Sequence, residues 1–179
     1  RYVEDLLAHE IRCFGGVDIQ TKRTACVFSG SVETAYRIWF WSRIATRLLM
    51  PLIKGKTENK DQLYDLARSI PWQDHFSVDQ SFAISTTISQ GTFGNPNYLN
   101  LVVKDAISDT FRSHYAGRRP SVDRTNPTVR INLFVRNFET TINLAPSATA
   151  LHQRSNRPTQ YGTILNTIKE NIAAAILMR

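Results

Sequence analysis

The sequence predicts an α+β fold made of two small units that follow one another along the chain. Apolar residues recur at helical spacing in some segments and at every second residue in others, and the two kinds of segment are interleaved. A length of 179 residues suits one or two small domains, and a hydrophobic fraction of 42% with 21% charged residues is typical of a folded chain. No apolar run approaches the roughly 18–20 residues that cross a bilayer, so no membrane partner is expected.

The first unit is predicted to cover residues 1–55. Its elements are a helix at 1–14, strands at 17–20 and 25–28, a helix at 31–41 and a strand at 44–54. Pro51 in the last strand indicates a sheet edge or a bulge. This order is that of a ferredoxin-like split βαβ unit whose first strand is missing.

The second unit is predicted to cover residues 56–146, followed by a linker and a last helix at 147–179. Its elements are helices at 60–70 and 96–116, a strand at 81–89, and strands at 129–135 and 140–144. Ile168, Ile172 and Ile176 recur along one stripe of the last helix. We expect this stripe to lack a partner within the chain.

The stretch from Tyr98 to Leu133 is predicted to be an amphipathic helix, a basic loop and a half-buried strand. From Arg112 to Arg157 there are eight arginines and two acidic residues, a net charge of +6 in a chain whose total is +7. Positive charge concentrated in this way is typical of a surface that binds a polyanion. A solvated basic face without a partner is the alternative.

The spacing of these cations places them at the helix end, in the loop and on the outward face of the strand. Asp123 could orient the guanidinium groups of Arg119 and Arg124, and His114 and Tyr115 could assist at the helix end. The candidate binding residues are Lys104, Arg112, Arg118, Arg119, Arg124 and Arg130.

Three other motifs carry weaker signals. The run Asn95-Pro96-Asn97-Tyr98 is similar to the Asn-Pro-Pro-Tyr motif of amino-methyltransferases, but it opens a helix, so capping explains it better. His9 and Cys13 share a helix face as half a metal site, and no metal is expected. The aromatic run 39–41 (Trp-Phe-Trp) is predicted to lie in the core or in an inter-domain seam.

Four segments resemble a known family. VKDAISDTFR (103–112) and RPSVDRTNPTVRINLFV (119–135) resemble the THUMP domain, an RNA-binding module. WSRIATRLLMPL (41–52) and TIKENIAAAILMR (167–179) resemble the bacterial 23S rRNA guanine 2-amino methyltransferases of the RlmL type. Such enzymes have a ferredoxin-like unit, a THUMP domain and then a Rossmann-like domain that uses S-adenosylmethionine.

The resemblance implies that this chain is the RNA-binding N-terminal region of a cytoplasmic rRNA methyltransferase. Its expected partners are 23S rRNA and the enzyme's own C-terminal methyltransferase domain. No catalytic residue and no cofactor are expected in this chain, with S-adenosylmethionine used by the parent enzyme. Two alternatives stay open: a fragment of a DNA adenine amino-methyltransferase, and a stand-alone RNA-binding module that is not an enzyme.

Overall fold

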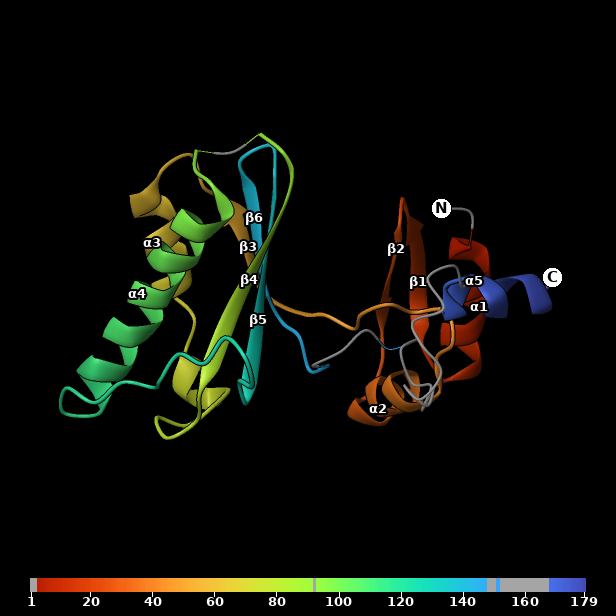
Figure 1. Ribbon diagram of the computed structural model, residues 1–179, viewed down its shortest axis with the longest axis horizontal. Coiled ribbons are helices and arrows are strands. Elements are labelled where there is room, and N and C mark those ends of the chain that lie inside the picture. The colour runs from red at the N-terminus through yellow and green to blue at the C-terminus, as the bar shows by residue number, and fades with distance from the viewer. Residues whose placement is uncertain (1–2, 92, 148–150, 152–167) are drawn as a thin grey trace, which may run out of the picture. The chain divides into compact units, whose positions relative to one another are not determined.

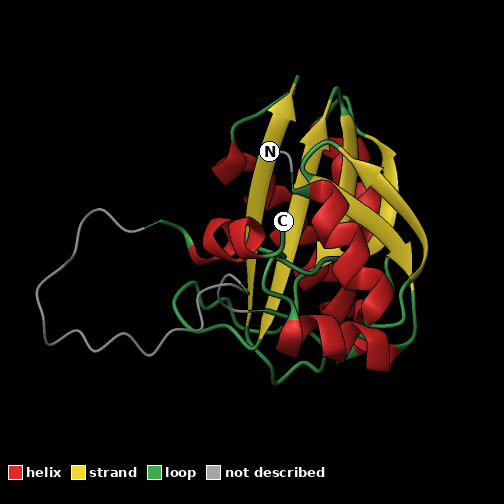
Figure 2. Cartoon of the chain, turned by 90° about the vertical axis from the view of Figure 1, so that its right-hand side faces the viewer, coloured by secondary structure: helices red, strands yellow, loops and turns green. Residues whose placement is uncertain are grey.

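The computed structural model describes residues 3–91, 93–147, 151 and 168–179. The chain forms two compact units, and each is treated by itself below (Figure 1). The first consists of Arg1–Leu48 and Ser147–Arg179, and the second of Leu49–Pro146. Helices and strands of both units can be followed by colour in Figure 2. The predicted α+β class is confirmed.

The first unit holds two helices, a hairpin and the last helix of the chain. These are α1 (Glu4–Cys13), β1 (Val17–Lys22), β2 (Ala25–Ser29), α2 (Val32–Trp41) and α5 (Glu170–Leu177). The strands β1 and β2 pair antiparallel, as expected. The buried carboxylate of Glu10 on α1 accepts hydrogen bonds from the Ser42 hydroxyl and from the backbone N–H of Arg43, at 2.8 Å. This carboxylate ties α1 to the chain that leaves α2.

The strand predicted at 44–54 differs from the observed one in its start and in its partner. The observed strand, β3 (Met50–Lys56), pairs with β6 (Glu139–Leu144) in the sheet of the second unit. Ile44, which precedes this strand, is held in the first unit, because the Glu10 side chain of α1 accepts its backbone N–H. The second unit accordingly starts at Leu49, whereas the sequence predicts a boundary after residue 55. Pro51 lies on an edge strand beside a register shift, as predicted.

The second unit is a four-stranded sheet with helices on one face. Its sheet order is β3-β6-β5-β4. The strands β4 and β5 are parallel and are joined by α4, whereas the other neighbours are antiparallel. Figure 1 shows α3 and α4 on the same side of this sheet. The remaining elements are α3 (Lys60–Arg68), the short 3-10 helix η1 (Trp72–Asp74), β4 (Phe82–Gln90), α4 (Pro96–His114) and β5 (Val129–Arg136).

The core of the second unit lies between α4 and the sheet. Alternate residues of β5 are fully buried, namely Ile131, Leu133 and Val135. They belong to one cluster with the apolar stripe of α4, whose members are Leu99, Val103, Ala106, Ile107 and Phe111. Burying a side chain of this kind contributes about 1.5–3 kcal/mol. The helical and two-residue periods predicted for 98–133 are therefore confirmed.

Two isoleucines of the last helix are exposed. Ile172 and Ile176 of α5 are 48% and 62% exposed, and Ile168, which precedes the helix, is 62% exposed, which confirms the expectation for these side chains. Ala175 is the residue of α5 that is buried. No helix in the described part of the chain is long and apolar enough to cross a membrane.

The start of α4 offers a direct test of the fold. The Asn95 side chain accepts the backbone N–H of Tyr98 at 2.8 Å, and Pro96 occupies the first turn. We expect Asn95→Ala to lower the free energy of unfolding by about 1 kcal/mol, because a donor of the first turn loses its partner. The matched control Asn97→Ala, in the same turn, should leave it within about 0.5 kcal/mol. Equal effects in urea denaturation would contradict the assigned cap.

Candidate nucleic-acid interface

The end of α4 and the loop after it form a fixed structure. Ala116 and Gly117 have φ of +48° and +85°, so the chain reverses there, and the Gly117 N–H donates to the Arg112 carbonyl at 3.0 Å. Farther on, the Phe82 N–H donates to the Ser121 carbonyl at 3.0 Å, and the Asp123 N–H donates to the Phe82 carbonyl at 3.1 Å. Because β4 anchors its middle, the loop holds its side chains in defined places.

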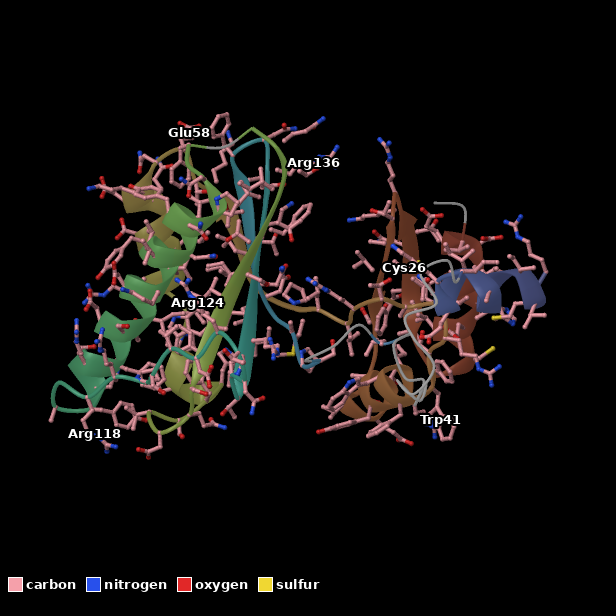
Figure 3. The ribbon with its side chains drawn as sticks, viewed as in Figure 1. Cys26, Trp41, Glu58, Arg118, Arg124 and Arg136 are labelled. Atoms are coloured by element: carbon pink, nitrogen blue, oxygen red, sulfur yellow. The ribbon has the colours of Figure 1, made fainter. Side chains whose placement is uncertain are left out.

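Five of the six candidate cations gather at one end of the sheet. Arg112 is in the last turn of α4, Arg130 is the second residue of β5, and the other three lie in the loop between them. Lys104 stands apart, since it lies eight residues before Arg112, about 12 Å along the helix. Figure 3 labels Arg118 and Arg124 on the side of the second unit that carries α4.

Nearby carboxylates pair with half of these cations. Lys104 pairs with Asp105 at 2.6 Å, Arg112 with Asp109 at 2.9 Å, and Arg118 with Asp79 at 2.6 Å. Arg119 and Arg124 are exposed and have no ion pair within the described ranges. Exposed pairs contribute at most about 1 kcal/mol, so a phosphate can replace the carboxylate. The six cations and the four carboxylates near one or another of them, those of Asp79, Asp105, Asp109 and Asp123, sum to a net charge of +2.

Asp123 shapes the loop rather than the arginines beside it. Its Oδ1 accepts the backbone N–H groups of Asn126 at 3.0 Å and Thr125 at 2.9 Å. These hydrogen bonds hold the pKa of Asp123 below its ordinary value, and Arg130 adds to the effect. The expectation that Asp123 orients Arg119 and Arg124 is wrong, because no ion pair joins Asp123 to either arginine among the described residues.

A hydrogen-bond network between α3 and α4 is not among the sequence predictions. The Tyr64 hydroxyl donates to Asp109 Oδ2 at 2.9 Å, and Arg68 donates to the Tyr64 oxygen at 3.3 Å. The hydrogen bond from Tyr64, and then that from Arg112, lowers the pKa of Asp109. Burial and the bond to Asp109 raise the pKa of Tyr64. The spacing of Tyr64 and Arg68 signals a local pair, but nothing in the sequence signals the link to the other helix.

The aromatic residue at the end of α4 is not available for stacking as expected. The Tyr115 ring stacks on Phe111, with 5.7 Å between ring centroids, and it packs against the core cluster. His114 is exposed, and its Nδ1 lies 2.9 Å from the Thr110 carbonyl oxygen. Of this pair, His114 is exposed and Tyr115 is half-buried.

The aromatic run of α2 is predicted to lie in a core or a seam, and the core prediction is wrong. Phe40 and Trp41 are 62% and 68% exposed, and Trp39 is half-buried. The buried positions of α2 are Thr34 and Ile38 instead. An apolar helix does not reveal from its sequence which of its faces the rest of the unit covers.

The remaining motifs are explained by contacts within single helices. Asn95 caps α4, so its side chain is engaged in the fold. The His9 Nε2 lies 3.6 Å from the Cys13 Sγ, and no group of three metal-ligating side chains occurs among the described residues. The start of α4 does not fit the phosphate of a nucleotide cofactor either, because Asn95 already occupies one N–H and Pro96 lacks one.

The Tyr64–Asp109 bond yields a prediction about titration. Because the folded pKa of Asp109 lies below its ordinary value of 3.8, the ionised group stabilises the fold above that pH, and this contribution is lost as the pH falls through the folded pKa. Tyr64→Phe removes the largest cause and should raise the pKa of Asp109. Carbon-detected NMR titration of the carboxyl group measures it. Tyr98→Phe serves as the control, and an unchanged pKa in Tyr64→Phe would refute the assignment.

Two family models match the chain, one on each unit. The RlmL ferredoxin-like domain matches residues 3–49, and the THUMP domain matches residues 57–144. The proteins of Syntrophotalea carbinolica and Allochromatium vinosum called "Ribosomal RNA large subunit methyltransferase K/L" are 38% and 40% identical over 99% and 100% of this chain. The chain spans about a quarter of their length, 24% in each case.

Solved structures share the fold. A Listeria monocytogenes protein described as a predicted N6-adenine-specific DNA methylase matches 99% of this chain and 45% of its own, with a TM-score of 0.85 at 22% identity. A putative methyltransferase complexed with SAH, SMU.472, matches 98% of this chain and 45% of its own, with a TM-score of 0.81 at 19% identity. The two domain matches show that the chain carries an RlmL ferredoxin-like domain followed by a THUMP domain, and the solved structures show that other proteins have the same fold.

Proposed function

We propose that this chain is the RNA-binding portion of a cytoplasmic rRNA methyltransferase. In this proposal it binds structured 23S rRNA and presents it to a C-terminal, S-adenosylmethionine-dependent domain that methylates a guanine exocyclic amine. The observation that carries the proposal is the arginine loop, residues 118–128, fixed at the end of α4 within a THUMP domain. The relatives' name supplies the class of RNA.

The geometry of the loop suits the backbone of folded RNA. Arg119 and Arg124 extend from either side of the segment that β4 anchors, so two planar forks are displayed on a fixed frame. The major groove of A-form RNA is too narrow for side chains, so such a surface reads phosphates and shape. The paired cations Arg112 and Arg118 can exchange their carboxylates for phosphates at small cost.

The chemistry belongs to another part of the parent enzyme in this proposal. The relatives are about four times as long as this chain, which leaves room for a separate catalytic domain. The exposed stripe of Ile168, Ile172 and Ile176 offers an apolar surface for the catalytic domain. A DNA adenine amino-methyltransferase would use the same fold, so duplex DNA belongs in every binding test.

The salt dependence of binding tests the proposal. We expect the affinity of the chain for a structured 23S rRNA fragment to fall steeply with salt, because each phosphate contact releases counterions. Arg119→Ala and Arg124→Ala should each reduce the slope of log affinity against log salt by about 0.7–0.9. Fluorescence anisotropy at several salt concentrations measures this slope.

Lys60→Ala is the matched control, because it removes one exposed charge from the start of α3. It should leave the slope unchanged. Affinity indifferent to salt, or equal slopes for all three variants, would refute the role of the loop. Tighter binding to duplex DNA than to RNA would favour the DNA enzyme.

A further inference from the structure

The sheet of the second unit has a face that no helix of this unit covers. On β5, the residues between the buried Ile131, Leu133 and Val135 point to this open face, and they are Arg130, Asn132, Phe134 and Arg136. The same alternation applies to the partners of β5. One row across the sheet reads Thr87, Phe134, Thr141 and Lys54, and another reads Arg136, Glu139 and Lys56.

The composition of this open face does not suit an apolar partner. A sheet face that packs against a second protein layer is normally lined by aliphatic residues. Here the paired positions hold four cations, one carboxylate, hydroxyls and amides around a single aromatic ring, that of Phe134, with Ala83 and Pro51 as the aliphatic members. The members are Ala83, Ser85 and Thr87 of β4, Arg130, Asn132, Phe134 and Arg136 of β5, Glu139, Thr141 and Asn143 of β6, and Pro51, Lys54 and Lys56 of β3.

Two buried amides hold the middle of the open face in place. The Asn132 side chain donates to the Ser85 carbonyl at 3.3 Å, and the Asn143 side chain donates to the Asn132 carbonyl at 3.3 Å. Both are buried, at 3% and 5% exposure. These bonds join β4, β5 and β6 across the ladder, and the exposed part of this face lies on the Phe134 side of them.

The charges of the open face are arranged for an anion. Lys54 pairs with Glu139 at 2.9 Å, whereas Lys56 and Arg136 have no ion pair within the part of the chain that the structure describes. Four cations and one carboxylate give the face a net charge of +3. A hollow of about 360 Å³ is lined by Lys56, Arg136, Asn137 and Glu139. Glu139 stands between Arg136 and Lys56 in the ladder, but its carboxylate pairs with Lys54, which leaves the two unpaired cations for a phosphate group.

Cations stand at both ends of β5, with the aromatic ring between them. Arg130 and Arg136 are six residues apart, about 20 Å along the strand. Figure 3 shows Arg136 at the other end of the sheet from Arg118 and the arginine loop. Phe134 is 37% exposed, so part of its ring is open to a ligand. Arg136 lies two residues beyond Phe134 on the same face of the strand, so a cation that can bind a phosphate stands next to a ring that can stack on a base.

We propose that the open face of the THUMP sheet binds a short single-stranded RNA segment, separately from the arginine loop. One base stacks on Phe134, and an adjacent phosphate lies between Lys56 and Arg136. This inference rests on the proposed function. It adds that the RNA bound by the arginine loop also has a single-stranded segment, which this face binds. Stacked aromatic platforms of this kind tolerate many sequences, because every base presents a π-face.

The test compares one RNA strand alone and in a duplex with its complement, using the whole 179-residue chain. Phe134→Leu removes the ring but keeps an apolar side chain. It should weaken single-strand binding about tenfold and leave duplex binding within about twofold. Phe134→Tyr keeps the ring and should retain binding. The control Tyr98→Leu changes a residue of similar exposure, 39%, on α4, and it should alter neither affinity.

The charges give a second readout. Replacing Lys56 and Arg136 by glutamine should lower the salt slope for the single strand by about 0.7 for each phosphate that is no longer bound. If Phe134→Leu matches Tyr98→Leu while melting like the wild-type chain, the open face is not the site. If Arg119→Ala still weakens duplex binding in that case, the proposed function stands alone. If the wild-type chain binds neither RNA at low salt, both proposals fall.

Discussion

The packing of α4 against β4 and β5 is the interaction on which the rest of the THUMP unit depends. Two parallel neighbours cannot be joined by a tight turn, so the chain must cross over the sheet, and α4 supplies the crossover. Its 19 residues extend about 28 Å, which returns the chain to the end of the sheet at which β4 and β5 have their first residues. The arginine loop lies at that end of the sheet because α4 is long enough to span the strands.

The same packing divides the unit into a buried and an open face. Residues of β5 alternate, so one set enters the core beneath α4 while the other set must face away from it. Near the C-terminal end of α4, the Phe111 ring contacts Phe76, at 5.0 Å between ring centroids, and Tyr115. A rigid core on one side is what allows a polar, cationic surface on the other to keep its shape.

Much of this unit could be predicted because its signals are local. Asn95 and Pro96 mark the start of α4, Gly117 marks its end, and the alternation in β5 marks a strand. The partner of β3 could not be predicted, since its pairing with β6 joins residues about ninety positions apart. The ion pair between Asp79 and Arg118 could not be predicted for the same reason, and it lowers the net positive charge expected for this surface. Loop arginines identify a cationic region, but the carboxylates that reduce its charge come from other segments.

Hydrogen–deuterium exchange of the chain, alone and with a structured 23S rRNA fragment, tests the central claim most directly. If α4 and β4 hold the arginine loop as the RNA-binding surface, the backbone N–H groups of residues 118–128 exchange more slowly in the complex. Those of α3 then keep the rate that they have in the free chain. Bound RNA with unchanged exchange throughout 112–130 would contradict the account, because the RNA would then contact some other part of the molecule.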